Sequence, residues 1–298
     1  MNAAAHLCFQ CWKNGILPQH KKNIYTFIFI HFTMSNNIWS IVLLGILLFL
    51  TFSGCTTTTD EPAVSNNDVL FQTSTIDSLI AGSYDGDMQV RDLKEQGDIG
   101  LGTFDRLDGE MIVIDGEVYR AKADGYIYQV NDTATTPFAA VTFFEADDTI
   151  TIGSNTDYAS LQSMIKENIP GPNLLYALKI EGTFENLSIR SVPAQSKPYR
   201  PLLDVVAEEE AVYHHENING TMVGFLLPYY IENINVPGYH FHFIDANKTV
   251  GGHVLACNLT SGSVELDYTY DFTLSLPESS SFSETLAGNK DTLEAIEQ

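Results

Sequence analysis

The chain has 298 residues, of which 44% are hydrophobic and 18% charged, and its formal net charge is −23 at pH 7. This length and composition are those of a folded protein with a sizeable core, and they exclude a disordered chain. The acidic balance also excludes nucleic acid and anionic lipid head groups as electrostatic partners, because both are negatively charged.

The first 67 residues predict export and tethering. Residues 38–52 are apolar and lead into a Ser-Gly-Cys sequence that ends at Cys55. This pattern resembles a lipoprotein signal, in which the cysteine thiol receives lipid, and an uncleaved membrane anchor is the alternative. Both place the following chain outside the cytoplasm, tethered to the membrane. We interpret residues 1–33 as an N-terminal extension, with Met1 and Met34 both candidate starts, residues 34–55 as signal or anchor, and residues 56–67 as a polar tether.

The cysteines give no disulfide framework. Cys8 and Cys11 form one isolated C-x-x-C pair, which we interpret as chance, and beyond Cys55 the chain contains one cysteine, Cys257. Disulfide staples therefore play no part in the predicted fold.

Residues 68–200 are predicted to form a first half built on sheet. Short runs of β-branched and aromatic residues are separated by Asp-Gly and Asn-Asp turns, which favours locally connected strands. Helical spacing occurs at residues 74–81, 88–96 and 157–167. Strands are expected at residues 100–104, 111–114, 117–121, 127–130, 138–144, 174–180 and 184–192.

Residues 201–298 are predicted to form a second half. A helix is expected at residues 202–216, and a last helical turn at 292–297. Strands are expected at residues 220–227, 239–244, 249–259 and 264–276. Because strands predominate, we predict an α+β fold of two halves, built on mostly antiparallel or mixed sheets with a few helices.

Three histidines form the pattern that carries chemistry. His240 and His242 lie two apart on an expected strand, so their side chains share a face. A hairpin closed at residues 245–248 predicts His240 opposite His253 and His242 opposite Gly251, with glycines keeping the site uncrowded. Opposed Cβ atoms lie about 5 Å apart, so three rings can converge on one ion.

Three imidazoles favour zinc and leave a fourth coordination position open for water or substrate. The simpler alternative is that these are ordinary core or surface histidines. The adjacent His214 and His215 lie in an expected helix rich in glutamate, where neighbouring side chains diverge, and we interpret them as solvated.

The sequence also resembles the acetolactate decarboxylase family, from about Leu70 to the C-terminus. Three motifs occur in the order of that family: Leu-Gly-Thr-Phe-Asp-Arg-Leu-Asp-Gly-Glu at residues 101–110, Ile-Arg-Ser-Val-Pro at 189–193 with Lys-Pro-Tyr at 197–199, and Gly-Tyr-His-Phe-His-Phe at 238–243 with Gly-Gly-His at 251–253.

The resemblance implies a Zn²⁺-dependent carboxy-lyase that converts 2-acetolactate, a small 2-hydroxy-3-oxo acid, to acetoin and CO2. It implies the metal as Lewis acid and electron sink, and a homodimer. It also implies a glutamate from the C-terminal tail, a role for which Glu297 is a candidate and which we leave unassigned. The implied site residues are the zinc ligands His240, His242 and His253, the catalytic Glu110 and Arg190, and Thr103 in the substrate pocket.

Two alternatives remain open from the residues alone. A three-histidine zinc site also suits another hydratase or hydrolase, because bound water becomes a nucleophile there. A lipoprotein that binds a metal or a small acid without catalysis is the second alternative.

Overall fold

The computed structural model describes residues 68–284, which belong to one compact unit. The predicted extension, signal or anchor, tether and last helical turn at 292–297 lie outside the described residues. Within residues 68–284, no helix is both long enough and apolar enough to cross a membrane.

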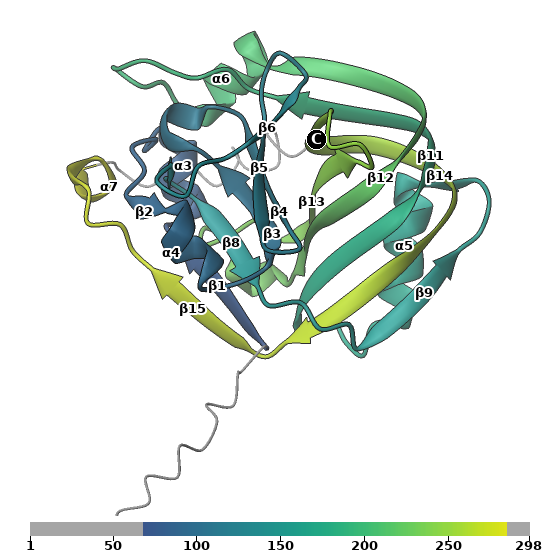
Figure 1. Cartoon of the computed structure of the whole chain (residues 1–298). Coiled ribbons are helices and arrows are strands. Elements are labelled where there is room, and N and C mark those ends of the chain that lie inside the picture. Colours follow the sequence, from purple (N-terminus) through teal and green to yellow (C-terminus); the bar gives the residue numbers. More distant parts are fainter. Residues whose placement is uncertain (1–67, 285–298) are drawn as a thin grey trace, which may run out of the picture. The chain divides into compact units, whose positions relative to one another are not determined.

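The first sheet has seven strands in the order β15-β1-β8-β3-β4-β5-β6 (Figure 1). Its strands β1 and β15 pair in parallel and the other neighbours pair antiparallel. The strands are β1 (Val69–Thr73), β3 (Ile99–Thr103), β4 (Glu110–Ile114), β5 (Glu117–Ala121), β6 (Ile127–Gln129), β8 (Ala139–Thr142) and β15 (Asp271–Ser275).

The second sheet is built on longer strands in the order β10-β14-β11-β12-β13, with β9 also paired to β14. Since β13 pairs with both β12 and β14, four of these strands close into a ring. The strands are β9 (Asp148–Ile152), β10 (Thr156–Asp157), β11 (Leu175–Ser191), β12 (Ala211–Leu227), β13 (Gly238–Asp245) and β14 (Gly251–Thr269). A separate ribbon joins β2 (Met88–Gln89) to β7 (Thr135–Thr136).

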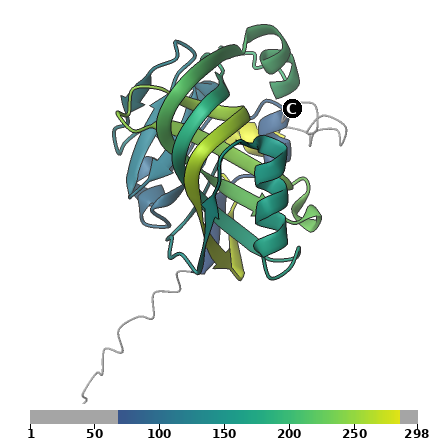
Figure 2. The same cartoon turned by 90° about the vertical axis from the view of Figure 1, so that its right-hand side faces the viewer.

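The longest helix of the described residues, α5, covers part of the second sheet. Helix α5 packs on the second sheet, where its buried Leu161 and Ile165 join the core of that sheet (Figure 2), and Asp157 caps its first turn through Ser160 N at 2.8 Å. The helices are α3 (Ile76–Ile80), α4 (Val90–Lys94), α5 (Tyr158–Asn168), α6 (Leu202–Glu209) and α7 (Ser280–Glu284), with short 3-10 turns η1 (Asp105–Leu107) and η2 (Tyr229–Ile231).

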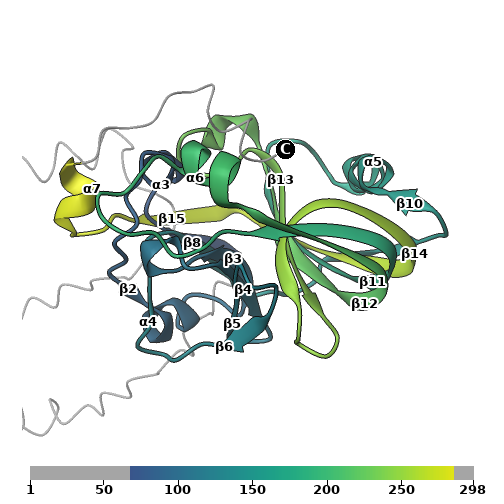
Figure 3. The same cartoon turned by 90° about the horizontal axis from the view of Figure 1, so that it is seen from above.

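The two sheets lie side by side and share buried side chains (Figure 3). Ile112 of the first sheet packs with Val223 and Ile244 of the second. Gly251 permits this close approach, because a Cβ there would lie 2.7 Å from Ile127 Cδ1 and 3.1 Å from Ile112 Cδ1. The glycine therefore makes room for the first sheet, whereas the sequence had suggested room for the histidine site.

The α+β class with mostly antiparallel and mixed sheets is confirmed. The helix expected at residues 202–216 was too long: α6 ends at Glu209 and the chain turns into β12 at Ala211. Tertiary pairing decides this point, because residues 211–219 align with the end of β11. The strands expected at 174–180 and 184–192 are one continuous strand, β11.

The sheets also interleave along the sequence. β11 precedes residue 200 yet belongs to the second sheet, and β15 follows it yet pairs with β1 of the first. The proposed division into residues 68–200 and 201–298 therefore does not coincide with the boundary between the sheets.

Candidate metal centre

The histidine hairpin forms with a different register from the expected one. His242 lies opposite His253, and Ile244 lies opposite Gly251, so the predicted pairs His240–His253 and His242–Gly251 were wrong by two residues. The connection is longer than expected because Asp245 N donates to Val250 O at 3.0 Å. A shift of two residues preserves the face of a strand, so all three histidines still face the same side.

The side chain of Asp245 holds this longer turn. Its carboxylate accepts from Thr249 N at 2.5 Å, Val250 N at 2.8 Å and Asn247 N at 3.0 Å, and from the Thr249 hydroxyl at 3.1 Å. The residue is 5% exposed. Such a buried carboxylate replaces several backbone hydrogen bonds and fixes where β14 begins.

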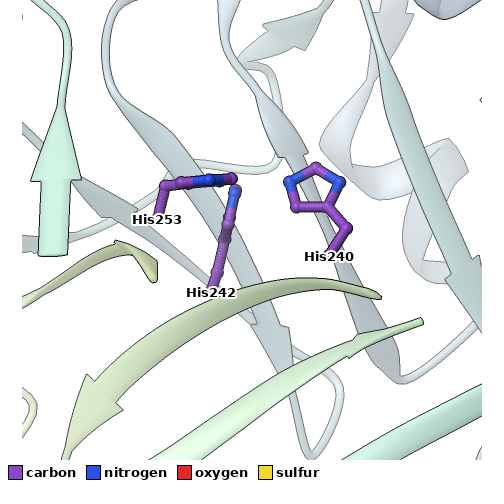
Figure 4. Close-up of side chains that lie close together, drawn as sticks. All are labelled: His240, His242 and His253. Carbon is purple, nitrogen blue, oxygen red and sulfur yellow. The ribbon is translucent and has the colours of Figure 1, made fainter. Parts of the chain in front are cut away.

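The three imidazoles converge (Figure 4). Ring centroids are 5.1 Å apart for His240 and His242, 5.0 Å for His240 and His253, and 5.5 Å for His242 and His253. One ligand atom from each ring lies within 4.8 Å of the others, and within residues 68–284 this is the one group of His, Cys, Asp or Glu with metal-binding geometry. The arrangement suits three ligands of a single ion.

The protonation state of the rings suits a metal as well. Burial, with the nearby charge of Arg190, lowers the pKa of His240 to about 3. Burial also lowers the pKa of His242 and of His253 well below the ordinary value, assisted by neighbouring imidazoles and Arg190. The rings are therefore neutral at pH 7, as ligands must be.

Hydrogen bonding of the rings also suits a bound cation. His242 Nδ1 donates to Met111 O on β4 at 2.7 Å, which fixes the ring and leaves Nε2 as the ligand atom. His240 Nδ1 is buried with no hydrogen-bond partner among the described residues. An orphaned buried ring nitrogen is costly unless something binds it, so the donor set fits a metal ion.

The first residue of β4 supplies a carboxylate. Glu110 Oε2 lies 3.6 Å from His242 Nε2, and the Glu110 side chain is 13% exposed. Thr103, opposite Glu110 in the ladder, donates its hydroxyl to Gly109 O at 2.8 Å. This bond holds the turn between β3 and β4, so Thr103 acts on the position of Glu110 as well as lining the pocket.

Strand β11 supplies a guanidinium. Arg190 is 6% exposed and lies opposite His253 in the ladder between β11 and β14. Its Nη1 is 3.5 Å from Glu210 Oε2, and its Nε has no hydrogen-bond partner among the described residues. The guanidinium is thus anchored at one end and keeps an unused donor, which suits it to bind an anion.

One pocket is lined by all six residues singled out from the sequence, together with apolar side chains of two helices. Sequence reasoning missed this apolar wall. Four of its residues lie on α3 and α6, and the docking of a helix leaves no local motif. Sequence reasoning also missed the Met111 carbonyl, which any residue type offers, and Glu210, which lay within a glutamate run typical of a solvated helix. The apolar wall is formed by Ile76, Leu79, Leu107, Phe138, Val192, Leu202 and Val206.

His214 and His215 take no part in this pocket. They lie on strand β12, whereas a helix was expected, and His214 is exposed, with Nδ1 2.8 Å from the Ser188 hydroxyl. The pair thus remains apart from the converging rings.

Comparison with known proteins agrees with the geometry. The family model for alpha-acetolactate decarboxylase matches residues 70–287. The alpha-acetolactate decarboxylase of Methanosarcina mazei is 46% identical over 80% of this chain and 83% of its own length, and that of Methylococcus capsulatus is 40% identical over 80% and 91%.

Solved structures show the same fold. The crystal structure of alpha-acetolactate decarboxylase from Bacillus subtilis strain 168 superposes with a TM-score of 0.75 at 38% identity, covering 77% of this chain and 97% of the other. A Staphylococcus aureus protein of unknown function, described as similar to that enzyme, gives a TM-score of 0.73 at 30% identity, covering 76% and 98%. The chain therefore belongs to the alpha-acetolactate decarboxylase family, a family of carboxy-lyases.

Proposed function

We propose that this chain decarboxylates 2-acetolactate to acetoin and CO2 with a zinc ion held by His240, His242 and His253. The observation that carries the proposal is the meeting of three neutral imidazoles with Glu110 and Arg190 in one buried pocket. Three imidazoles leave a coordination position for substrate, and family membership supplies the substrate class.

Zinc bound there would act as a Lewis acid on the hydroxyl and ketone oxygens of the substrate. Arg190 would bind the carboxylate or a neighbouring oxygen, because its buried Nε has a free donor. Decarboxylation breaks the bond from C2 to the carboxylate carbon, and the electron pair moves toward the neighbouring ketone. Arg190 orients that bond for cleavage.

Glu110 would supply the proton that completes acetoin. After CO2 departs, the electron pair is shared between C2 and the oxygen of the neighbouring ketone, and C2 needs one proton to give acetoin. The carboxyl group lies beside His242, largely shielded from solvent. A proton delivered from this position ends on C2 and gives the hydroxy ketone.

The apolar wall would exclude water and receive the two methyl groups of the substrate. Leu79 on α3 and Val206 on α6 lie in one buried cluster with Phe138. Exclusion of water strengthens the interactions of Arg190 and Glu110 with the reacting atoms.

Acetoin formation from 2-acetolactate by the full chain tests the proposal, with zinc present and after chelation. We expect zinc-dependent acetoin, with a loss of about 100-fold or more in Glu110→Gln. Another zinc hydratase or hydrolase has no need of Glu110, and a binding protein makes no acetoin. Absence of acetoin from a folded, zinc-loaded protein would reject the assignment.

We also propose that the chain is extracytoplasmic and tethered through lipid on Cys55 or through the uncleaved apolar segment. The support is the apolar run at residues 38–52 before Cys55. Fractionation of cells that express the chain and its Cys55→Ser variant is the test. Incorporation of labelled fatty acid into the wild type and not into the variant supports lipidation, membrane retention of an unlabelled wild type supports the uncleaved anchor, and a cytoplasmic wild type contradicts both.

Assembly as a homodimer is a further part of this proposal and rests on the family resemblance. Light scattering on the purified chain measures the mass directly. A monomeric mass at micromolar concentration would remove this part of the proposal.

A further inference from the structure

We propose that a second pocket, beside Arg106 and Arg120, binds a small oxyanion that carries a carboxylate or phosphate group. The pocket has a volume of about 250 Å³ and is lined by both arginines, by two threonines and by Ala194. None of these residues lines the histidine pocket. The inference is therefore independent of the proposed decarboxylation.

Charge is the first argument. Two aspartates line the pocket, and both are already engaged: Asp105 accepts from Gly86 N at 2.9 Å, and Asp108 accepts from Arg120 Nη1 at 2.6 Å. Lys122 Nζ lies 3.0 Å from the same Asp108 oxygen. Three cationic groups thus gather around two carboxylates in a chain of net charge −23. The lining itself is balanced, with two arginines against two aspartates, and Lys122 outside the lining adds a positive charge beside Asp108. Because Asp108 is shared by two cations, an anion meets less repulsion there than elsewhere on so acidic a protein.

Arg120 is held in place with donors to spare. Its guanidinium carbon lies 4.0 Å from the centroid of the Phe104 ring, a cation–π contact that orients the planar group. Nη1 is bound by Asp108, while Nε is buried without a hydrogen-bond partner among the described residues. Arg120 therefore keeps donor capacity that its pairing with Asp108 does not use.

Arg106 is fixed by an unusual backbone. Its φ is 63°, a left-handed conformation that is costly for a residue other than glycine. Hydrogen bonds hold it there: Arg106 N donates to Tyr84 O at 2.7 Å, Gln195 N donates to Arg106 O at 2.7 Å, and Arg106 Nε donates to Gln195 O at 3.0 Å. The surrounding fold thus maintains this arginine at the pocket despite the strain.

The size and the polar groups indicate the class of ligand. Thr135 adds a hydroxyl-bearing side chain beside the two guanidinium groups, whereas the Thr133 hydroxyl already donates to Asn131 Oδ1 at 3.2 Å. A pocket of about 250 Å³ is smaller than the pockets that usually take drug-sized molecules, so it suits a small acid or inorganic phosphate. Carboxylate and phosphate share the acceptor geometry that arginine recognises, and the experiment separates them.

Calorimetric titration of the full, zinc-loaded chain tests the site, with inorganic phosphate and with acetate as probes at constant ionic strength. Ala194→Glu places a carboxylate at the pocket without removing a native hydrogen bond, and Ala194→Gln is its neutral, equally large control. We expect saturable binding in the roughly millimolar range for at least one probe, weakened about tenfold or more by Ala194→Glu and within about twofold in Ala194→Gln. The probe that binds more tightly identifies the anion class.

Phosphate also has affinity for zinc, so binding at the histidine pocket must be separated. That binding would be equal in the two Ala194 variants and would disappear after chelation. The proposal is overturned if neither probe binds saturably, if both variants bind equally, or if chelation abolishes all binding. Acetoin formation should be unchanged in both variants, which confirms that each is folded.

Discussion

The hairpin of β13 and β14 and the strand pair β3 and β4 supply two walls of the same pocket, but they are specified in different ways. Three histidines of the hairpin lie within one short stretch of sequence, and their common face follows from the period of a strand. Glu110 reaches them only because the two sheets pack together across Gly251. Local pattern thus makes the histidine cluster, while long-range packing brings Glu110 to it.

Removal of a ligand should have the largest effect. In His242→Ala we expect loss of bound zinc and a fall in acetoin formation of at least about 1000-fold, because the Lewis acid is absent. Metal content by mass spectrometry and the acetoin assay measure both. His215→Ala, on β12 outside the pocket, is the control and should keep both. An active, metal-free His242→Ala protein would refute the metal-dependent mechanism.

A change in Arg190, which the pairing of β11 with β14 brings to the pocket, tests long-range pairing without touching the proposed metal ligands. In Arg190→Lys we expect kcat/KM to fall roughly 100-fold, about 2.7 kcal/mol, because an ammonium cannot reproduce the planar, two-pronged contact. Zinc content should remain at the wild-type level. Arg91→Lys changes the same residue type in an exposed ion pair with Asp92 and should be neutral. Full activity in Arg190→Lys would show that a charge alone suffices.

The turn that sets the hairpin register should have an intermediate effect. Asp245→Ala removes a buried acceptor of three backbone N–H groups. We expect about 2 kcal/mol less stability in urea unfolding and roughly tenfold weaker zinc binding, because the histidines lose their fixed register. Asn247→Ala in the same turn keeps the carboxylate and is the control. Equal zinc affinity in Asp245→Ala would mean that sheet packing alone fixes the register.

The smallest expected effect is on the pH dependence of stability, and it comes from Asp267, which lies on β14 outside the hairpin. Burial raises the pKa of Asp267 from 3.8 to about 7, with nearby acids adding to the shift, while a hydrogen bond from Glu145 N opposes it. The folded state therefore favours the protonated carboxyl, so its contribution to stability is present below about pH 4 and is lost as pH rises to about 7.

At pH 8, Asp267→Asn should be more stable than the wild type by roughly 1 kcal/mol, and this difference should vanish near pH 4. Urea unfolding across this range measures it, with Asp92→Asn on the surface as control. A stability difference that does not change with pH would show that Asp267 does not titrate in this range. Activity should stay constant, since Asp267 does not line the histidine pocket.

Most strands could be predicted because turns and β-rich runs leave local signals, as in the strand at residues 117–121. The end of α6 could not, since residues 211–216 have helical composition and become strand only through pairing with β11. Strand β15 was likewise merged with β14, because its separation at Tyr270 depends on pairing with β1.

By itself, the sequence determined the histidine constellation and the common face of its members, because strand periodicity is a local property that survives a register shift of two. Only the tertiary structure decided which histidines oppose each other, which carbonyl holds His242, and which helices close the pocket. Those features depend on contacts between residues far apart in the chain, and such contacts arise from the packing of two sheets rather than from any short pattern.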